Sequence, residues 1–201
     1  MLRVGLTGGL ATGKSFVGQA LKDLGCHLLM ADALGHQSLE PGGGAFDQAL
    51  AEFGADILGE DGKIDRRKLG AIVFADPARL ARLNSFVHPV VIAREEEWMR
   101  QVESVDPGAI AVVEAAILIE TGSHRRFHQL VLTVCDREQQ IERAMKRDGL
   151  AREEVERRLE RQMPLEEKRK FADYVVDTSG EKEATLRQVK QLHAALRSLS
   201  S

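Results

Sequence analysis

Apolar runs recur along the chain with amphipathic stretches between them, a pattern typical of strands that alternate with helices. The runs lack the strict alternation of half-exposed strands, so they favour a parallel sheet that is covered on both faces. They lie at residues 2–7, 27–31, 109–113, 130–134 and 174–176. Helices between them imply right-handed crossovers. We therefore predict an α/β fold with a parallel five-stranded sheet and a ligand site at the carboxyl ends of its strands.

Two intervals between the predicted strands are too long for simple crossovers. The first, about 32–107, contains a glycine-rich turn at 41–44 followed by helical patterns at 45–53 and 77–87. We expect this interval to form a lobe that holds a second substrate.

The second long interval, about 137–171, is strongly charged and helical in pattern, with breaks at Gly149 and Pro164. We expect it to form a lid, and we expect a final helix at 181–199 to pack on the core. The chain then forms a single domain over 1–201, whose core comprises about 1–31, 108–136 and 172–201.

The glycine-rich segment after the first predicted strand indicates the most specific chemistry in the chain. Residues 8–15 read Gly-Gly-Leu-Ala-Thr-Gly-Lys-Ser and fit the phosphate-binding pattern G-x-x-x-x-G-K-[ST]. Glycines let the backbone approach a polyphosphate, and successive N–H groups form an anion nest at a helix N-terminus. Lys14 can reach the outer phosphates and Ser15 can offer its hydroxyl to Mg²⁺. The strand before the segment and the helical face after it are the context that this motif requires.

Two carboxylates follow predicted strands and are candidates for the chemistry. Asp32 comes just after the second strand, where it could accept a proton from an acceptor hydroxyl or orient that hydroxyl. It could equally be a helix N-cap. Glu114 ends the third strand and could hold Mg²⁺ directly or through water, or be an ordinary carboxylate at a strand end.

Cations of the lid interval are nearly balanced by acidic residues, which favours solvated, salt-bridged helices for most of them. Arg143 and Arg147 are the exception that we single out, because four-residue spacing places them on one helix face. A lid that closes over a nucleoside triphosphate needs such cations to neutralise the transferring phosphoryl group. His88 is a further candidate, although a lone histidine is commonly a structural hydrogen-bonding group.

Composition narrows the functional classes. The 201 residues are 43% hydrophobic and 29% charged, as in ordinary globular proteins, and the net charge of −3 gives no reason to expect nucleic-acid binding. Cys26 and Cys135 have no metal-ligand spacing and suggest a reducing compartment. No apolar run is long enough to span a membrane, and the first strand begins at once, without a signal peptide. We expect a cytoplasmic protein with no nucleic-acid or membrane partner.

Taken in order, the segments resemble the dephospho-coenzyme A kinase family over nearly the whole chain. Residues 4–15 are similar to the opening of that family, and Leu-Met-Ala-Asp-Ala-Leu-Gly at 29–35 is similar to its aspartate motif. The remaining matches lie at 61–69, 73–76, 87–89, 140–143, 147–150, 161–163 and 172–177. Beyond the phosphate-binding segment, the order and spacing of the matches carry the resemblance.

The resemblance implies a three-layer P-loop NTPase fold, similar to that of nucleoside monophosphate kinases, in a monomer or small homo-oligomer. ATP, with Mg²⁺, would phosphorylate the ribose 3′-hydroxyl of dephospho-coenzyme A to give coenzyme A and ADP. Asp32 would be the base or hydroxyl-orienting group, Arg143 and Arg147 would act from the lid, and Arg66 and His88 would lie in or near the acceptor lobe. The ATP-binding residues would be Gly8, Gly9, Ala11, Thr12, Gly13, Lys14, Ser15 and Phe16.

Three parts of the chain depart from the family pattern. Residues 116–120 read Ala-Ile-Leu-Ile-Glu where the family usually has Pro-Leu-Leu-Phe-Glu, so the proline and the aromatic residue are missing. Thr178 stands where the family often has asparagine, and Phe16 stands where a hydroxyl residue is usual. Backbone contacts to phosphate survive the change at Phe16.

Two other functions compete with this one. Another small-molecule kinase that acts on a nucleoside or nucleotide would share the phosphate-binding segment, because that segment contacts only the donor. A GTP-binding switch would use a D-x-x-G element, which residues 32–35 fit. However, the guanine-binding N-K-x-D element is absent, because the one asparagine, Asn84, precedes Ser85.

Overall fold

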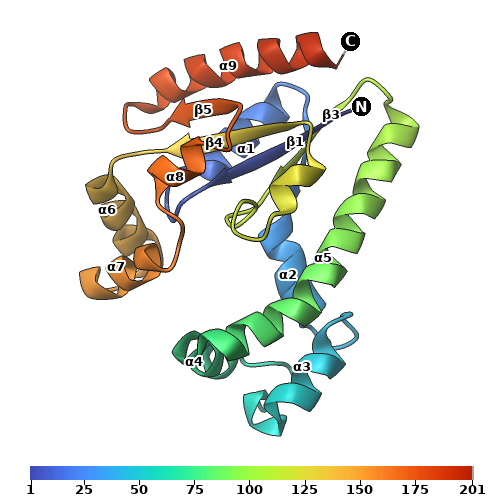
Figure 1. Ribbon diagram of the computed structural model, residues 1–201, viewed down its shortest axis with the longest axis vertical. Helices are drawn as coiled ribbons and strands as arrows, with labels where there is room; N and C mark the ends of the chain where they lie inside the picture. The colour runs from blue at the N-terminus through green and yellow to red at the C-terminus, as the bar shows by residue number, and fades with distance from the viewer. Residues whose placement is uncertain (201) are drawn as a thin grey trace. The chain divides into compact units, whose positions relative to one another are not determined.

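A computed structural model describes residues 1–200 of the protein as two compact units (Figure 1). The first unit contains Met1–Met30 and the chain from Met99 onward, and the second is Ala31–Trp98. The strands are β1 (Leu2–Gly8), β2 (His27–Met30), β3 (Ile110–Glu114), β4 (Gln129–Val134) and β5 (Tyr174–Asp177). The helices of the first unit are α1 (Lys14–Asp23), η2 (Ser123–Arg126), α6 (Arg137–Asp148), α7 (Arg152–Glu160), α8 (Leu165–Arg169) and α9 (Lys182–Leu199). The remaining helices are α2 (Ala31–Ser38), α3 (Phe46–Phe53), η1 (Ala55–Ile57), α4 (Arg66–Ala75) and α5 (Pro77–Val105).

The five strands form one parallel sheet in the order β2-β3-β1-β4-β5, which confirms the predicted fold class. Glu114 at the end of β3 pairs in register with Leu6 of β1 and with Met30 of β2. On the other side, Gly8 of β1 pairs with Thr133 of β4. The parallel direction and this register place the carboxyl ends of the strands at one edge, where α/β folds bind their ligands.

Helices α1 and α9 cover one face of the sheet (Figure 1). The amphipathic repeat of α9 explains its position, because Val189, Leu192 and Leu196 are spaced three and four residues apart and are all buried. They pack with Val17 and Leu21 of α1 and with the central strands. Each fully buried aliphatic side chain of this kind contributes about 1.5–3 kcal/mol to folding. This core holds β1 and α1, and therefore the segment between them, in a fixed relation.

Helix α5 corrects the sequence prediction, which ended a helix at residue 87. The helix runs through Pro89 and continues to Val105. A proline inside a helix costs about 3 kcal/mol because it removes a hydrogen bond and clashes with the preceding turn. Met99 and Val102, beyond the proline, are buried, and their packing offsets that cost. The last turns of α5, from Met99 onward, belong to the first unit, whereas the sequence analysis assigned residues up to about 107 to the acceptor lobe.

The second unit has a hydrophobic core of its own. Ala49 and Phe53 of α3, Ile57 of η1 and the α4 residues Leu69 and Val73 are buried together. Helix α4 begins at an N-cap, Asp65, whose carboxylate accepts hydrogen bonds from the backbone N–H groups of the second and third helical residues at 2.8 and 3.3 Å. These two hydrogen bonds lower the pKa of the Asp65 carboxyl. Within residues 1–200, none of the helices has the length and apolarity to cross a membrane.

Candidate functional site

The glycine-rich segment lies at the carboxyl end of β1 and leads directly into α1, which begins at Lys14. The Gly13 N-cap has a φ of +79°, in the left-handed region that favours glycine. Position 8 has room only for glycine, because a Cβ atom there would lie 2.3 Å from the Thr133 hydroxyl oxygen. Ala11 also has a positive φ, +55°, which costs an L-residue about 1–2 kcal/mol. The segment is therefore held in a special backbone conformation by the residues around it.

Hydroxyl groups and a lysine hold this loop from inside. The Thr12 hydroxyl donates to the Gly9 carbonyl at 3.0 Å and is hydrogen-bonded to the Thr133 hydroxyl of β4 at 2.8 Å. The Lys14 ammonium donates to the same Gly9 carbonyl at 2.9 Å. This contact folds the Lys14 side chain back along the loop and keeps its charge beside the backbone that would surround a polyphosphate.

Ser15 and Glu114, which the sequence analysis named separately as candidates for Mg²⁺, are in contact in the structure. The Ser15 hydroxyl donates to Glu114 Oε1 at 2.7 Å, and Glu114 is only 5% exposed. Neighbouring hydroxyl and carboxylate oxygens are the type of ligand that Mg²⁺ prefers. The two side chains therefore fit a magnesium ion beside the phosphate-binding loop.

The two arginines predicted to act together lie on α6 but have different partners. Arg143 donates from Nη2 to the Thr178 carbonyl at 2.8 Å and from Nη1 to the Thr178 hydroxyl at 3.2 Å. Arg147 makes two hydrogen bonds to Asp148, Nε to Oδ1 at 2.7 Å and Nη2 to Oδ2 at 2.9 Å. These hydrogen bonds from Arg147 lower the pKa of the Asp148 carboxyl. Arg143 is thus fixed near the loop, whereas the charge of Arg147 is balanced by its neighbour.

Thr178 explains how the chain accommodates one of its departures from the family pattern. Its hydroxyl lies 3.0 Å from the Thr12 carbonyl and 3.2 Å from the Val134 carbonyl, and its side chain is buried. It therefore connects the end of β5 to the phosphate-binding loop and receives Arg143 on its other side. Thr178 thus links α6 to the loop, because its hydroxyl contacts both Arg143 of α6 and the Thr12 carbonyl of the loop.

Two glutamines that the sequence analysis did not select bind the loop at Leu10. Gln162 accepts the Leu10 N–H at 2.8 Å, and the Gln140 amide donates to the Leu10 carbonyl at 2.8 Å. Leu10 and Ala11 also pack against a small apolar cluster formed by Ile141, Ala144 and Val155. Both glutamines lie in segments that resemble the family pattern, 140–143 and 161–163, but only cations were assigned roles in this charged interval, so the neutral amides were not selected.

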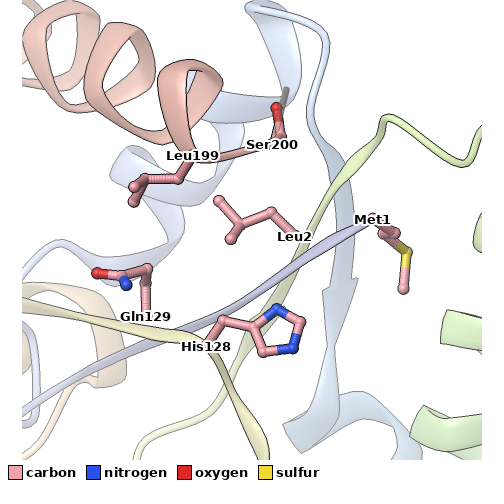
Figure 2. A pocket seen from close by; sticks show the side chains of 6 residues that line it. All are labelled: Met1, Leu2, His128, Gln129, Leu199 and Ser200. Atoms are coloured by element: carbon pink, nitrogen blue, oxygen red, sulfur yellow. The ribbon is translucent and has the colours of Figure 1, made fainter.

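A cavity of about 330 Å³ lies beside the loop. Its lining combines the start of the loop, the end of β4 and the segment between α7 and α8, with the residues Gly9, Cys135, Asp136, Arg137, Gln140, Leu159, Gln162, Met163, Pro164, Leu165 and Glu166. A larger cavity of about 460 Å³ lies at the amino ends of β1 and β4 (Figure 2). Its six lining residues carry no charged side chain, and its His128 Nδ1 accepts the Arg3 N–H at 3.1 Å. The cavity beside the loop is the candidate for a phosphorylated ligand because Gly9 of the phosphate-binding loop lines it.

Three predicted residues lie in the second unit. Asp32 is exposed in the first turn of α2, where the helix dipole favours a carboxylate, and it is two residues beyond the end of β2. Arg66 begins α4 and lies 3.4 Å from a Glu40 carboxylate oxygen. His88 is half-buried in α5, and this burial lowers its pKa.

Comparison with known proteins gives a consistent result. The family model described as dephospho-CoA kinase matches residues 2–184. A dephospho-CoA kinase of Geobacter sulfurreducens is 41% identical over 192 residues, which are 95% of this chain and 96% of the relative. That of Aquifex aeolicus is 38% identical over 196 residues, 98% of each chain. A crystal structure of the Thermus thermophilus protein TT1252 is 34% identical, covers 96% of this chain and 97% of its own, and has a TM-score of 0.82.

Proposed function

The chain belongs to the dephospho-CoA kinase family, and from that premise we propose how its residues divide the work of the reaction. The family uses ATP to phosphorylate dephospho-CoA in the final step of coenzyme A biosynthesis. The phosphoryl group goes to the 3′-hydroxyl of the ribose. The observation that supports this function best is the preformed phosphate-binding loop between β1 and α1, with Lys14 folded over it.

The loop binds the phosphates of ATP in this proposal. Its backbone N–H groups, at the N-terminus of α1, would form an anion nest, and the Lys14 ammonium would move from the Gly9 carbonyl to the outer phosphates. Phosphoryl transfer depends on such positioned charge more than on covalent chemistry. The residues assigned to ATP are Gly8, Gly9, Ala11, Thr12, Gly13, Lys14, Ser15 and Phe16.

Ser15 and Glu114 would hold Mg²⁺. Their hydrogen bond brings the hydroxyl and the carboxylate to the same point, which an oxygen-binding cation could occupy. When bound, the ion neutralises charge on the phosphate oxygens of ATP. Among residues 1–200, no cluster of three or more histidine, cysteine, aspartate or glutamate side chains forms a separate metal site. The two-residue site beside the loop is therefore the one that we assign to magnesium.

The acceptor is assigned to the second unit, Ala31–Trp98, which contains most of the lobe predicted at about 32–107. Asp32 would accept the proton of the 3′-hydroxyl or orient that hydroxyl for attack. Arg66 and His88 would bind the acceptor, and the exposed guanidinium of Arg66 is suited to its phosphate groups. Residues of about 137–171 would act as the lid, from which Arg143 and Arg147 contact the transferring phosphoryl group.

Arg147 is the more demanding assignment, because Asp148 already holds its guanidinium. We expect Arg147→Ala to lower kcat by about tenfold or more if the side chain leaves Asp148 to stabilise the transition state. The dissociation constant of ATP should change less than kcat, because the contact belongs to the transition state. Steady-state kinetics and ATP titration measure the two quantities.

Arg152→Ala is the matched control for this change. Arg152, the first residue of α7, is also paired with carboxylates: its guanidinium lies 2.6 Å from Glu138 and 3.0 Å from Glu156. It has no role in the proposal. Its replacement should leave kcat unchanged. An unchanged kcat for Arg147→Ala as well would assign Arg147 to the surface ion pairs.

The reaction itself is tested by incubating the purified protein with ATP, Mg²⁺ and dephospho-CoA while coenzyme A and ADP are measured. We expect coenzyme A at rates within the ordinary kinase range, about 1–100 per second. Nucleosides and nucleoside monophosphates serve as parallel acceptors and should give much slower turnover. Turnover restricted to those acceptors would instead indicate another small-molecule kinase of the same fold.

We also propose that the protein works in the cytoplasm on small molecules alone, as a monomer or small homo-oligomer. Its two cysteines support a reducing compartment, because Cys26 and Cys135 are both buried as free thiols. Burial raises the pKa of the Cys26 thiol to about 11, which keeps it protonated and unreactive at neutral pH.

A further inference from the structure

A buried lysine outside every motif binds the base of the phosphate-binding loop. Lys168 lies on α8 and its side chain is 0% exposed. Its ammonium nitrogen lies 2.8 Å from Glu120 Oε1, 3.0 Å from the Ala116 carbonyl and 3.3 Å from the Gly8 carbonyl. An ammonium group has three N–H donors, and these three acceptors use all of them. Lys168 therefore has no donor left for a substrate while these contacts persist.

The two carbonyls that Lys168 binds belong to the two segments that carry the proposed chemistry. Gly8 is both the last residue of β1 and the first residue of the phosphate-binding loop. Ala116 lies two residues beyond Glu114, the carboxylate that contacts Ser15. One ammonium group thus connects the start of the anion nest to the chain just after the metal-binding candidate.

Glu120, the anionic partner, extends this connection to the segment before α8. The same oxygen that pairs with Lys168 accepts the Met163 N–H at 3.3 Å. The preceding residue, Gln162, accepts the Leu10 N–H of the loop. Residues 162–168 therefore contact the loop at Leu10 and at Gly8, and Glu120 holds this segment between the two contacts. Glu120 therefore has a structural role in segment 116–120, where the proline and the aromatic residue of the family pattern are missing.

The charge of Lys168 needs an explanation, because a buried ammonium group is a poor means of stabilising a fold, even beside a carboxylate that is partly exposed, as Glu120 is at 22%. Desolvation offsets much of the attraction, and well-packed apolar residues are often as stable or more stable. What a charged group with several fixed partners supplies is a defined geometry for those partners. Here the partners are the carbonyls that set the positions of the loop and of the Glu114 segment.

We propose that Lys168 is a positioning residue for phosphoryl transfer, which holds the loop and the Glu114 segment in the relation that the transition state requires. The proposal rests on the kinase function proposed above. Its role is indirect, through Gly8 and Ala116, and it extends the site to a helix that the sequence analysis placed in the lid. A displacement of about 1 Å in such a site can cost about 100-fold in rate.

The test compares Lys168→Met with a double variant, Lys168→Met/Glu120→Gln. The single variant leaves the Glu120 carboxylate without its cation, so both the melting temperature and kcat should fall. The double variant buries no charge, and the amide oxygen introduced by Glu120→Gln can still accept the Met163 N–H. We expect its melting temperature to return toward that of the wild type while kcat stays about 100-fold low. The KM for ATP should rise by a smaller factor than kcat falls.

Lys170→Met is the matched control, because Lys170 is an exposed lysine two residues away. It should leave both quantities unchanged. A double variant that regains kcat together with its melting temperature would show that Lys168 serves stability alone and would overturn the proposal. The wild type in the same assay separates the kinase function from the role of Lys168. If the wild type forms no coenzyme A, the proposed kinase function fails. If the wild type and the double variant are both fully active, only the role of Lys168 is contradicted.

Discussion

Replacing Lys14 with alanine should lower kcat by about a thousandfold or more, the effect of removing a positioned charge from a site where negative charge develops. The Lys14 ammonium already lies 2.9 Å from the Gly9 carbonyl, inside the loop that would surround the phosphates. Its loss leaves the backbone N–H groups in place, so ATP should still bind, although more weakly. Rapid-quench or coupled assays of coenzyme A formation, with ATP titrations beside them, measure both effects.

Lys22→Ala controls for the loss of a lysine from the same helix. Lys22 is exposed in the last turn of α1, far along the helix from the loop, so its removal should leave kcat unchanged. A melting temperature close to that of the wild type for both variants would show that the fold is intact. If Lys14→Ala kept wild-type kcat, the loop would bind phosphate without taking part in transfer.

The features that the sequence predicted correctly are those encoded by local patterns. The parallel sheet follows from apolar runs, and the phosphate-binding loop follows from glycines and Lys14 within one short segment. In both cases a short stretch of chain carries both the signal and its structural consequence. The hydrogen bond between Ser15 and Glu114 was not predicted, because it joins residues 99 positions apart, although both lie where an α/β fold brings strand ends together.

The features that the sequence could not predict depend on partners that are distant along the chain. Lys168 lies 160 residues from Gly8 along the chain, and no sequence motif links a lysine in a charged segment to a backbone carbonyl so far away. The two glutamines that bind Leu10 lie 130 and 152 residues from it along the chain and carry no charge. The helical pattern predicted at 77–87 belongs to a longer helix, α5, which continues through Pro89 because packing beyond the proline outweighs its local cost.

Thr178 is a further residue whose role depends on contacts that are distant along the chain. As a departure from the family pattern, it raised the question of which contacts replace those of an asparagine. Its hydroxyl contacts the Thr12 and Val134 carbonyls and receives Arg143, so the position connects β5 to the loop. A sequence comparison identifies the change, whereas only the three-dimensional contacts reveal what the new residue does.

The second large effect is expected for Asp32→Asn, which should lower kcat by about 100-fold or more, the usual contribution of a general base. Asparagine has nearly the same size and keeps an oxygen that can accept a hydrogen bond, but it cannot take up the proton of the 3′-hydroxyl. Because one residue separates Asp32 from Met30, covalent geometry keeps its Cα within about 7 Å of the end of β2. The phosphate-binding loop is untouched, so the dissociation constant of ATP should stay near that of the wild type.

Asp47→Asn provides the control, because Asp47 is also exposed in the first turn of a helix of the second unit, α3. A loss of activity in both variants would indicate a general effect of removing negative charge from this unit. A loss confined to Asp32→Asn, with unchanged ATP binding, would place the defect in the handling of the acceptor. Full activity of Asp32→Asn would show that the assignment of the base is wrong. His88 of the acceptor lobe would then be the first alternative, because its lowered pKa favours the neutral imidazole, which can accept a proton.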